Sequence, residues 1–387
     1  MIAQLRLPAL DGTLRPFRPG SAPALSAPDA PPRLRVAYAA AHVVCDPTAN
    51  YDPLGNAPID WDATMAYRRH LWSLGLGVAE AMDTAQRGMG LDAAAAFELI
   101  EHSLGAARSA GGAIACGAGT DQLDPGCPHD LSAIEDAYLE QCRFIESRGG
   151  RVILMASRAL AAAARGPDDY ARIYSAVLGS LERPAILHWL GPMFDPKLAG
   201  YWGSADLDRA ADTALAIVGD NVAKVDGLKM SLLDKTREVA FRRRLPKGVR
   251  MYTGDDFHYP ELVRGDASGH SDALLGIFDA IALPAACALE ALDGGDLERY
   301  DAIFAPTVPL ARHIFAAPTF SYKTGIVFLA YLNGHQRHFR MLGGAESARS
   351  ILHLAELFRL ADAAGVLVDR ELAAERMTLV LRLAGIA

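Results

Sequence analysis

The chain has 387 residues, of which 51% are hydrophobic and 22% are charged, as in an ordinary globular protein. Lys and Arg total 38 against 46 Asp and Glu, and the resulting net charge of -8 disfavours nucleic acids and anionic membranes as partners. The five cysteines form no CxxC pair, so neither a disulfide framework nor a structural zinc site is indicated. A reducing, cytoplasmic location is expected.

The N-terminal segment lacks the long apolar core of a signal peptide, and no apolar run approaches the roughly 18 residues that a membrane span needs. Pro19 to Pro32 are rich in Pro, Ala and Ser. We therefore expect residues 1–32 to form an irregular lead-in before the folded core.

From Arg33 onward one unit recurs: a short apolar run, a polar or glycine-containing turn, and an alanine-rich helical stretch. Parallel strands that are covered on both faces are typically unbroken apolar runs, and strands that alternate with helices indicate βα units. The expected strands are Leu34–Val44, Gly77–Met82, Ala113–Cys116, Val152–Ala156, Ala185–Trp189, Val225–Met230, Val249–Thr253 and a weak run at Ala267–His270. The helices expected between them include Trp61–Leu74, Ala93–Ala110 and Leu131–Ser147.

Eight strands in this rhythm predict an α/β fold, a closed (β/α)₈ TIM barrel over residues 33–290. After Pro284 the strand signal stops, and apolar residues recur every three or four positions, as in Ser347–Ala364. Residues 291–387 are therefore expected to be a helical extension that packs on the barrel.

In barrel enzymes the active site lies at the C-terminal ends of the strands, so the polar residues that close each apolar run are the candidates. Lys229 is the strongest of them because it lies inside the apolar run Val225–Met230. Burial lowers the pKa of a lysine, and the free amine is a nucleophile toward carbonyl groups. The alternative is a lysine that reaches solvent from the end of a strand.

The segment around Lys229 resembles the Gly-Ile-Lys strand of the dihydrodipicolinate synthase and N-acetylneuraminate lyase superfamily, as in a divergent branch of it. Over roughly residues 33–365, further stretches resemble family motifs in the same order: Ile59-Asp60, Gly75, Arg183–His188 with Pro192, Thr253–Asp256, Asp266–His270, Lys323 and Arg340. The resemblance implies that Lys229 forms a Schiff base with the substrate, that no cofactor is needed, and that the protein is a homodimer or homotetramer.

Three departures from the family pattern bear on the substrate. Where the family has Gly-Thr-Thr-Gly-Glu, this chain keeps Thr84 but has Asp83 where a substrate carboxylate would lie. Two carboxylates repel strongly in a site of low dielectric constant. His188 replaces the tyrosine that relays protons in the family, and Met193 stands where some members have a carboxylate-binding arginine. We therefore expect a neutral keto-sugar or polyol-derived ketone.

In this hypothesis Lys229 attacks the ketone and His188 transfers protons, since an unperturbed imidazole titrates near neutrality. The residues expected to bind substrate are Asp83, Thr84, Gly254, Asp255, His270 and His42. The structural alternatives are a buried core histidine for His188 and a helix N-cap for Asp83.

Two other functions stay open. Imidazoles and carboxylates from different strands (His42, Asp83, His188, Asp255 and His270) would suit a zinc, manganese or iron site in a metal-dependent barrel lyase, isomerase or hydrolase. No compact HxH or HExxH motif supports such a site. A barrel that only binds a sugar-like ligand is the third possibility, and a lysine kept inside an apolar strand argues against it.

Overall fold

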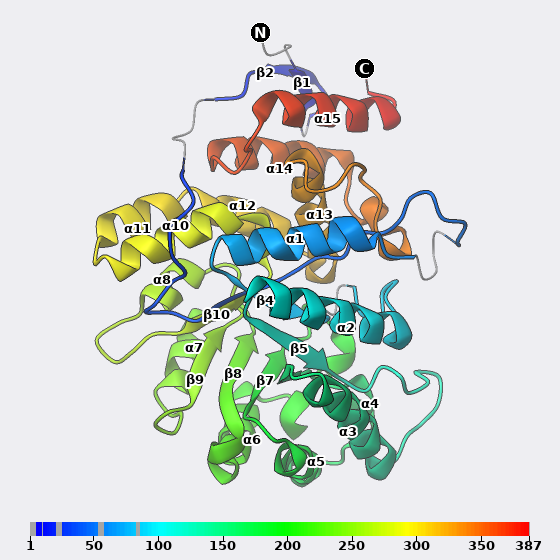
Figure 1. Ribbon diagram of the computed structural model, residues 1–387, viewed down its shortest axis with the longest axis vertical. Coiled ribbons are helices and arrows are strands. Elements are labelled where there is room, and N and C mark those ends of the chain that lie inside the picture. Colours follow the sequence, from blue (N-terminus) through cyan, green and yellow to red (C-terminus); the bar gives the residue numbers. More distant parts are fainter. Residues whose placement is uncertain (1–4, 10, 21–24, 53–57, 83–85, 387) are drawn as a thin grey trace.

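The computed structural model describes residues 5–9, 11–20, 25–52, 58–82 and 86–386. Eight parallel strands form a closed barrel in the order β10-β3-β4-β5-β6-β7-β8-β9 (Figure 1). They are β3 (Ala37–Ala40), β4 (Gly77–Glu80), β5 (Ile114–Ala118), β6 (Arg151–Leu154), β7 (Ala185–Leu190), β8 (Val225–Ser231), β9 (Arg250–Thr253) and β10 (Asp272–Leu275). The prediction of a TIM barrel is confirmed.

The last barrel strand is the one whose predicted position was wrong. Ala267–His270 forms a turn in which the Asp266 amide donates to the Gly269 carbonyl (2.8 Å). The strand follows at Asp272–Leu275 and closes the barrel against β3, with Ala273 opposite Ala37. Its apolar run continues through Gly276 directly into the next helix, so that periodicity alone does not separate strand from helix.

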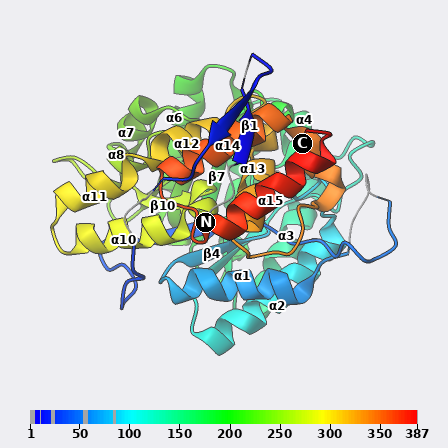
Figure 2. The same cartoon turned by 90° about the horizontal axis from the view of Figure 1, so that it is seen from above.

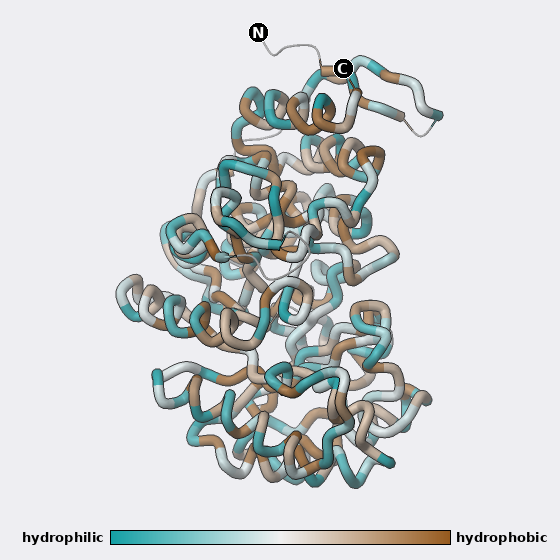
Figure 3. Tube along the Cα trace, turned by 90° about the vertical axis from the view of Figure 1, so that its right-hand side faces the viewer, coloured by the Kyte–Doolittle hydropathy of each residue, from teal (hydrophilic) through white to brown (hydrophobic). Residues whose placement is uncertain are grey.

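Helices cover the outside of the barrel and alternate between hydrophobic and hydrophilic residues along the chain (Figure 3). Most of the longer ones begin at an aspartate whose side chain accepts a hydrogen bond from the first turn, as Asp60, Asp92 and Asp130 do. These helices are α1 (Trp61–Ser73), α2 (Ala93–Ala110), α3 (Leu131–Ser147), α4 (Arg158–Ala163), α5 (Pro167–Ser180), α6 (Leu207–Asp220), α7 (Lys235–Arg242), α8 (Tyr259–Arg264) and α9 (Ile277–Ala280).

The rest of the chain is helical and lies over one end of the barrel, together with both termini (Figures 1 and 2). It consists of α10 (Ala282–Asp293), α11 (Leu297–Phe304), α12 (Thr307–Ile314), α13 (Tyr322–Leu332), α14 (Ile351–Ala363) and α15 (Arg370–Leu383). Every residue of α13 is buried. A helix that is buried all round belongs in a core, and α13 therefore anchors this layer on the barrel.

The N-terminal segment, expected to be irregular, contains a two-stranded antiparallel hairpin, β1 (Leu5–Pro8) with β2 (Leu14–Phe17). The hairpin packs on α14: Phe17 meets Phe358 edge to face at 5.8 Å. Residues 25–32 have no regular secondary structure. No helix in the described ranges is long and apolar enough to cross a membrane.

Candidate active site

Lys229 lies near the C-terminal end of β8, where side chains alternate between the inside and the outside of the barrel. In register, Lys229 is opposite His188 on β7 and Tyr252 on β9, and Ser231 is opposite Leu190. Residues paired in this way point to the same face, so the amine, the imidazole and the Ser231 hydroxyl all enter the barrel from neighbouring strands. Lys229 is 6% exposed.

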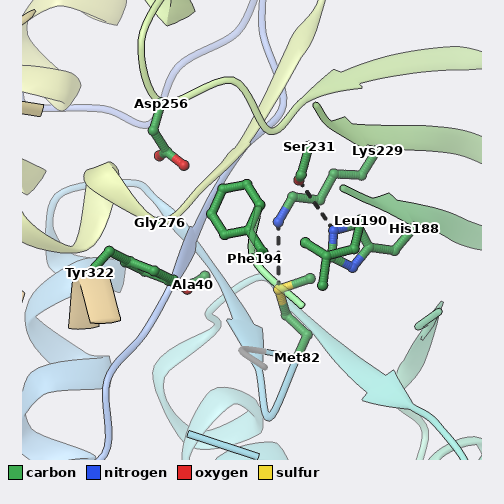
Figure 4. A pocket seen from close by; sticks show the side chains of 10 residues that line it. All are labelled: Ala40, Met82, His188, Leu190, Phe194, Lys229, Ser231, Asp256, Gly276 and Tyr322. Carbon is green, nitrogen blue, oxygen red and sulfur yellow. Dashed lines mark hydrogen bonds between the residues drawn. The ribbon is translucent and has the colours of Figure 1, made fainter. Parts of the chain in front are cut away.

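These side chains line a cavity of about 20 Å³ at the C-terminal end of the barrel (Figure 4). The Lys229 amine points into it and lies 3.7 Å from the sulfur of Met82. Among the described residues the lining consists of Ala40, Met82, His188, Leu190, Phe194, Lys229, Ser231, Asp256, Gly276 and Tyr322. The site is therefore small and is lined about equally by polar and apolar residues, with an amine, an imidazole, two hydroxyls and one carboxyl.

His188 is 2% exposed, and its Nε2 lies 3.2 Å from the Ser231 hydroxyl oxygen. Within the part of the chain that the structure describes, its Nδ1 has no hydrogen-bond partner. Burial, followed by the positive charge of Lys229, holds the pKa of His188 well below the ordinary 6.5. The imidazole is thus neutral at neutral pH, and it is a weaker base than the unperturbed histidine expected from the sequence.

Asp256 provides the only carboxyl among the described lining residues, on the side of the cavity away from His188. One of its oxygens accepts a hydrogen bond from the Ile277 amide at the start of α9 (2.8 Å). Burial raises the pKa of Asp256 to about 7, against the lowering effects of that hydrogen bond and of the charges on Lys229 and Lys323. A carboxyl with this pKa exchanges protons near neutrality.

Asp255 and Gly254, both predicted to bind substrate, lie beside Asp256. The Asp255 carboxylate accepts hydrogen bonds from the amides of Phe257 (2.8 Å) and His258 (3.0 Å), and its second oxygen lies 2.9 Å from the His258 ring. Asp255 thus holds the turn after β9 and does not line the cavity. Gly254 lies against Lys229, where a Cβ would be 2.8 Å from Lys229 Cε.

The structure separates the other predicted residues. His42 is fully buried just behind the cavity and pairs with Asp279 (2.9 Å). His270 is exposed and precedes β10, at the opposite end of the barrel from Lys229. Asp83 and Thr84 lie outside the described residues, and they follow Met82 directly in sequence.

The ligands considered for a metal are likewise dispersed. His42 pairs with Asp279, His188 with Ser231, and Asp255 with His258. Across the described residues, no three His, Cys, Asp or Glu side chains are grouped so that they could hold one metal ion.

Sequence reasoning did not single out Ser231, Tyr322 or Phe194, and of the two adjacent aspartates it chose Asp255 over Asp256. Ser231 had a signal, because a residue two positions beyond Lys229 on a strand shares its face. Phe194 and Tyr322 come from the loop after β7 and from a helix about 130 residues farther along the chain. No spacing rule links them to Lys229.

The model of one protein family, described as "Protein of unknown function (DUF993)", matches residues 5–386. No curated protein matches the sequence. Among solved structures, dihydrodipicolinate synthase from Aquifex aeolicus is 12% identical with a TM-score of 0.64, and 86% of this chain covers 99% of that one.

Dihydrodipicolinate synthase from Thermotoga maritima gives 13% identity and a TM-score of 0.64, over 87% of this chain and 100% of that one. A prophage protein of the dihydrodipicolinic acid synthase family from E. coli K12, solved in complex with pyruvate, is 12% identical with a TM-score of 0.66, over 86% of this chain and 99% of that one. At these identities the comparisons show a shared fold, and the predicted resemblance to the dihydrodipicolinate synthase fold is confirmed at that level.

Proposed function

The chain belongs to the family described as "Protein of unknown function (DUF993)", and we propose that it is a class I aldolase or related lyase that forms a Schiff base on Lys229. The observation that carries the proposal is the placement of Lys229: a buried amine at the C-terminal end of a barrel strand, opposite His188 in register. This end of the barrel is where enzymes of this fold hold their chemistry.

The proposed reaction begins with imine formation on Lys229. The amine of Lys229 adds to a substrate ketone and forms a carbinolamine, which loses water to give an iminium ion. The iminium accepts the electron pair of the adjacent C–C or C–H bond when that bond breaks, and the resulting enamine is later protonated and hydrolysed. His188, which is neutral and bonded to Ser231, accepts and returns the protons.

The substrate proposed is a neutral keto-sugar or polyol-derived ketone. Among the described residues that line the cavity none is an arginine, and the one cation is the amine that would be consumed by the imine. Asp256 adds a carboxyl to the lining, and the sequence puts Asp83 next to Met82. A substrate carboxylate in the cavity would be repelled by the Asp256 carboxylate, whereas hydroxyl groups would donate hydrogen bonds to it.

The relative from E. coli that was solved with pyruvate suggests the opposite substrate class, a 2-oxo acid. We infer the neutral class for this chain because Asp83, His188 and Met193 depart from the family pattern. Pyruvate is therefore the natural comparison ligand in any test.

We also propose a homodimer or homotetramer built through the late helices, in a reducing cytoplasm where the protein acts in carbohydrate metabolism. All five cysteines are free thiols, and four of them are buried. Free thiols suit a reducing compartment. Light scattering of the purified protein measures the oligomeric state directly.

The proposed activity is tested by trapping with borohydride, which reduces an imine to a stable secondary amine. The protein is incubated with pyruvate, dihydroxyacetone or a panel of neutral keto-sugars, then reduced, digested and analysed by mass spectrometry. Lys229→Arg cannot form the imine, and Lys224→Arg is the matched control, since Lys224 bonds to the Leu181 carbonyl before β8 begins.

An adduct on the Lys229 peptide from a keto-sugar but not from pyruvate is expected. An adduct from pyruvate alone keeps the aldolase and overturns the inferred substrate class. If no carbonyl compound labels Lys229 and a metal copurifies with the protein, the metal-dependent alternative replaces the Schiff-base proposal.

A further inference from the structure

A bend beside the cavity is held in a conformation that its own residue disfavours. Ala81, which directly follows β4, has a φ of +49°. A residue with a Cβ rarely adopts this left-handed region, because the Cβ crowds the carbonyl oxygen that follows it. Such a conformation persists only where the surrounding structure imposes it, and it is most common at functional sites. Ala81 is buried, so contacts inside the protein impose it.

Two ion pairs hold Ala81, one at its amide and one at its carbonyl. The Ala81 amide donates to the carboxylate of Glu80 (3.0 Å), which is paired with Arg68. The Ala81 carbonyl accepts a hydrogen bond from the guanidinium of Arg87 (2.8 Å). Arg87 in turn pairs through Nε and Nη2 with the two carboxylate oxygens of Asp121, each at 2.8 Å. Both polar groups of Ala81 are thus bonded to charged side chains that are themselves fixed.

Arg87 also ties this bend to the next strand. It is 5% exposed, and the nitrogen that donates to Ala81 donates as well to the carbonyl of Gly117 in β5 (2.7 Å). Its other terminal nitrogen donates to the side chain of Gln141 in α3. A Cβ on Gly117 would lie 2.6 Å from the Ala81 carbonyl oxygen and 2.9 Å from Cα of Met82. The two backbones therefore approach closely enough for one guanidinium nitrogen to bind both carbonyls.

Met82 is the residue that this bend places. It is buried, it lines the cavity, and its sulfur lies 3.7 Å from the Lys229 amine (Figure 4). A thioether is a weak, uncharged hydrogen-bond acceptor that can orient an amine, whereas a carboxylate in its place would favour the protonated ammonium. Because the backbone at Ala81 sets the direction in which the next side chain leaves the chain, its conformation decides whether the sulfur meets the amine.

We propose that Arg87 is a positioning residue of this site: it holds the left-handed bend at Ala81 and thereby keeps the Met82 thioether against the Lys229 amine. Arg87 is not among the described residues that line the cavity, so it acts through the backbone. The role of Lys229 as a nucleophile rests on the proposed function, whereas the link from Arg87 through Ala81 to Met82 does not. Loss of the guanidinium would let Ala81 relax to a negative φ and turn Met82 away from Lys229.

The link is measured without any substrate, by NMR of the full-length protein with isotope-labelled methionine methyl groups. The measured quantity is the nuclear Overhauser effect (NOE) between the Met82 methyl group and the Lys229 side chain, which a contact at 3.7 Å makes observable. Met82→Leu and Lys229→Arg assign the two signals by their loss. Arg87→Gln is compared with Arg151→Gln, the matched control, since Arg151 pairs with Asp226 (3.0 Å) at the start of β6, away from the cavity.

Arg87→Gln is expected to abolish this NOE and to lower the rate of borohydride trapping on Lys229 at least about tenfold, as misplacement around a reacting group does. Adding Ala81→Gly is expected to restore most of both, because glycine adopts a positive φ without steric cost and keeps the bend without Arg87. A merely structural role of Arg87 predicts no such rescue, since a glycine does not repair a loosened core. Arg151→Gln is expected to match the wild type in both measurements.

An NOE in Arg87→Gln equal to that of the wild type overturns the proposal, as does a loss that Ala81→Gly does not reverse. If Arg87→Gln does not fold, Asp121→Ala decides, with and without Ala81→Gly, because Asp121 anchors Arg87 and is less buried. A lost NOE with an unchanged trapping rate overturns the positioning role. A wild type that shows the NOE but forms no adduct with any carbonyl compound removes the Schiff-base function and leaves the link between Arg87 and Met82 standing.

Discussion

A Cβ placed on Gly254 would lie 2.8 Å from Cε of Lys229 and 2.1 Å from the Ser231 hydroxyl oxygen. The end of β9 therefore has room for the Lys229 side chain because residue 254 has none of its own. The Gly254 amide also donates to the Met230 carbonyl on β8 (2.9 Å), which fixes the backbone at this close approach. Gly254 shapes the site through the space that it leaves.

Gly254→Ala is expected to displace Lys229 and Ser231 and to lower the rate of borohydride trapping on Lys229 at least about tenfold, as misplacement of a reacting group does. The matched control is Gly219→Ala in α6, where a Cβ meets no other atom within 4 Å. That control is expected to trap at the wild-type rate. Equal rates in the two variants would contradict the steric role of Gly254.

Glu238 of α7 is predicted to make stability fall as pH rises. It is 1% exposed and accepts hydrogen bonds from Ser271 (2.7 Å) and Thr253 (2.9 Å). Burial raises the pKa of Glu238 from 4.5 to about 8. Because the folded state holds this proton more tightly than the unfolded state, the stabilisation is present below pH 4.5 and is lost as pH rises to about 8.

Glu238→Gln removes this titration. The free energy of unfolding of the variant minus that of the wild type is expected to increase between pH 5 and pH 9 by at most about 5 kcal/mol. Urea unfolding at several pH values measures this difference, in which the contributions of other groups cancel. A difference that stays constant with pH would show that Glu238 does not titrate in this range.

His335, which follows α13, is predicted to weaken the fold in acid. Its ring centroid lies 4.6 Å from that of His70 and 4.9 Å from that of Tyr67. Burial, followed by the neighbouring His70 and His42, lowers the pKa of His335 from 6.5 to about 4. The unfolded state binds the proton first, so stability present above pH 6.5 is lost as pH falls to about 4.

His335→Phe keeps the ring packing and removes the titration. Between pH 7 and pH 4 it is expected to lose about 2 kcal/mol less stability than the wild type, after a discount for the partial exposure of His335. His102→Phe, at an exposed position on α2, is the control and is expected to follow the wild type. If the free energy of unfolding changes with pH in the same way for the wild type, His335→Phe and His102→Phe, then His335 is not the group that weakens the fold in acid.

Arg68 of α1 and Glu80 of β4 form a fully buried bidentate pair, with N–O distances of 2.8 and 2.9 Å. Ser103 also donates to Glu80 (2.6 Å). Arg68→Met leaves the buried Glu80 carboxylate without its ion-pair partner and is expected to cost about 3–5 kcal/mol in the free energy of unfolding. Adding Glu80→Gln removes the stranded charge and is expected to recover part of this loss.

The control for Arg68 is Arg69→Met, its exposed neighbour on the same helix, which is expected to change stability by less than about 0.5 kcal/mol. Urea unfolding followed by circular dichroism gives all the values. If the double variant is no more stable than Arg68→Met alone, the loss comes from packing and not from a stranded charge.

The sequence alone determined the barrel and the position of its lysine. Buried parallel strands need unbroken apolar runs, and the predicted runs at Ala185–Trp189 and Val225–Met230 stood out for this reason. A lysine inside such a run must lie near other strand ends of the barrel. His188, which the family resemblance singled out on the preceding strand, pairs with Lys229 in register. Strand periodicity is local, so it can be read from a single segment.

Only the tertiary structure decided which groups complete the site. Asp255 and Asp256 are neighbours in sequence, yet one binds the amides of its own turn and the other enters the cavity, because the backbone turn directs their side chains differently. Tyr322, Lys323 and Asp279 reach the site through the packing of α13 and α9 on the barrel. Contacts between distant segments depend on how whole helices pack, and no spacing within one segment encodes them.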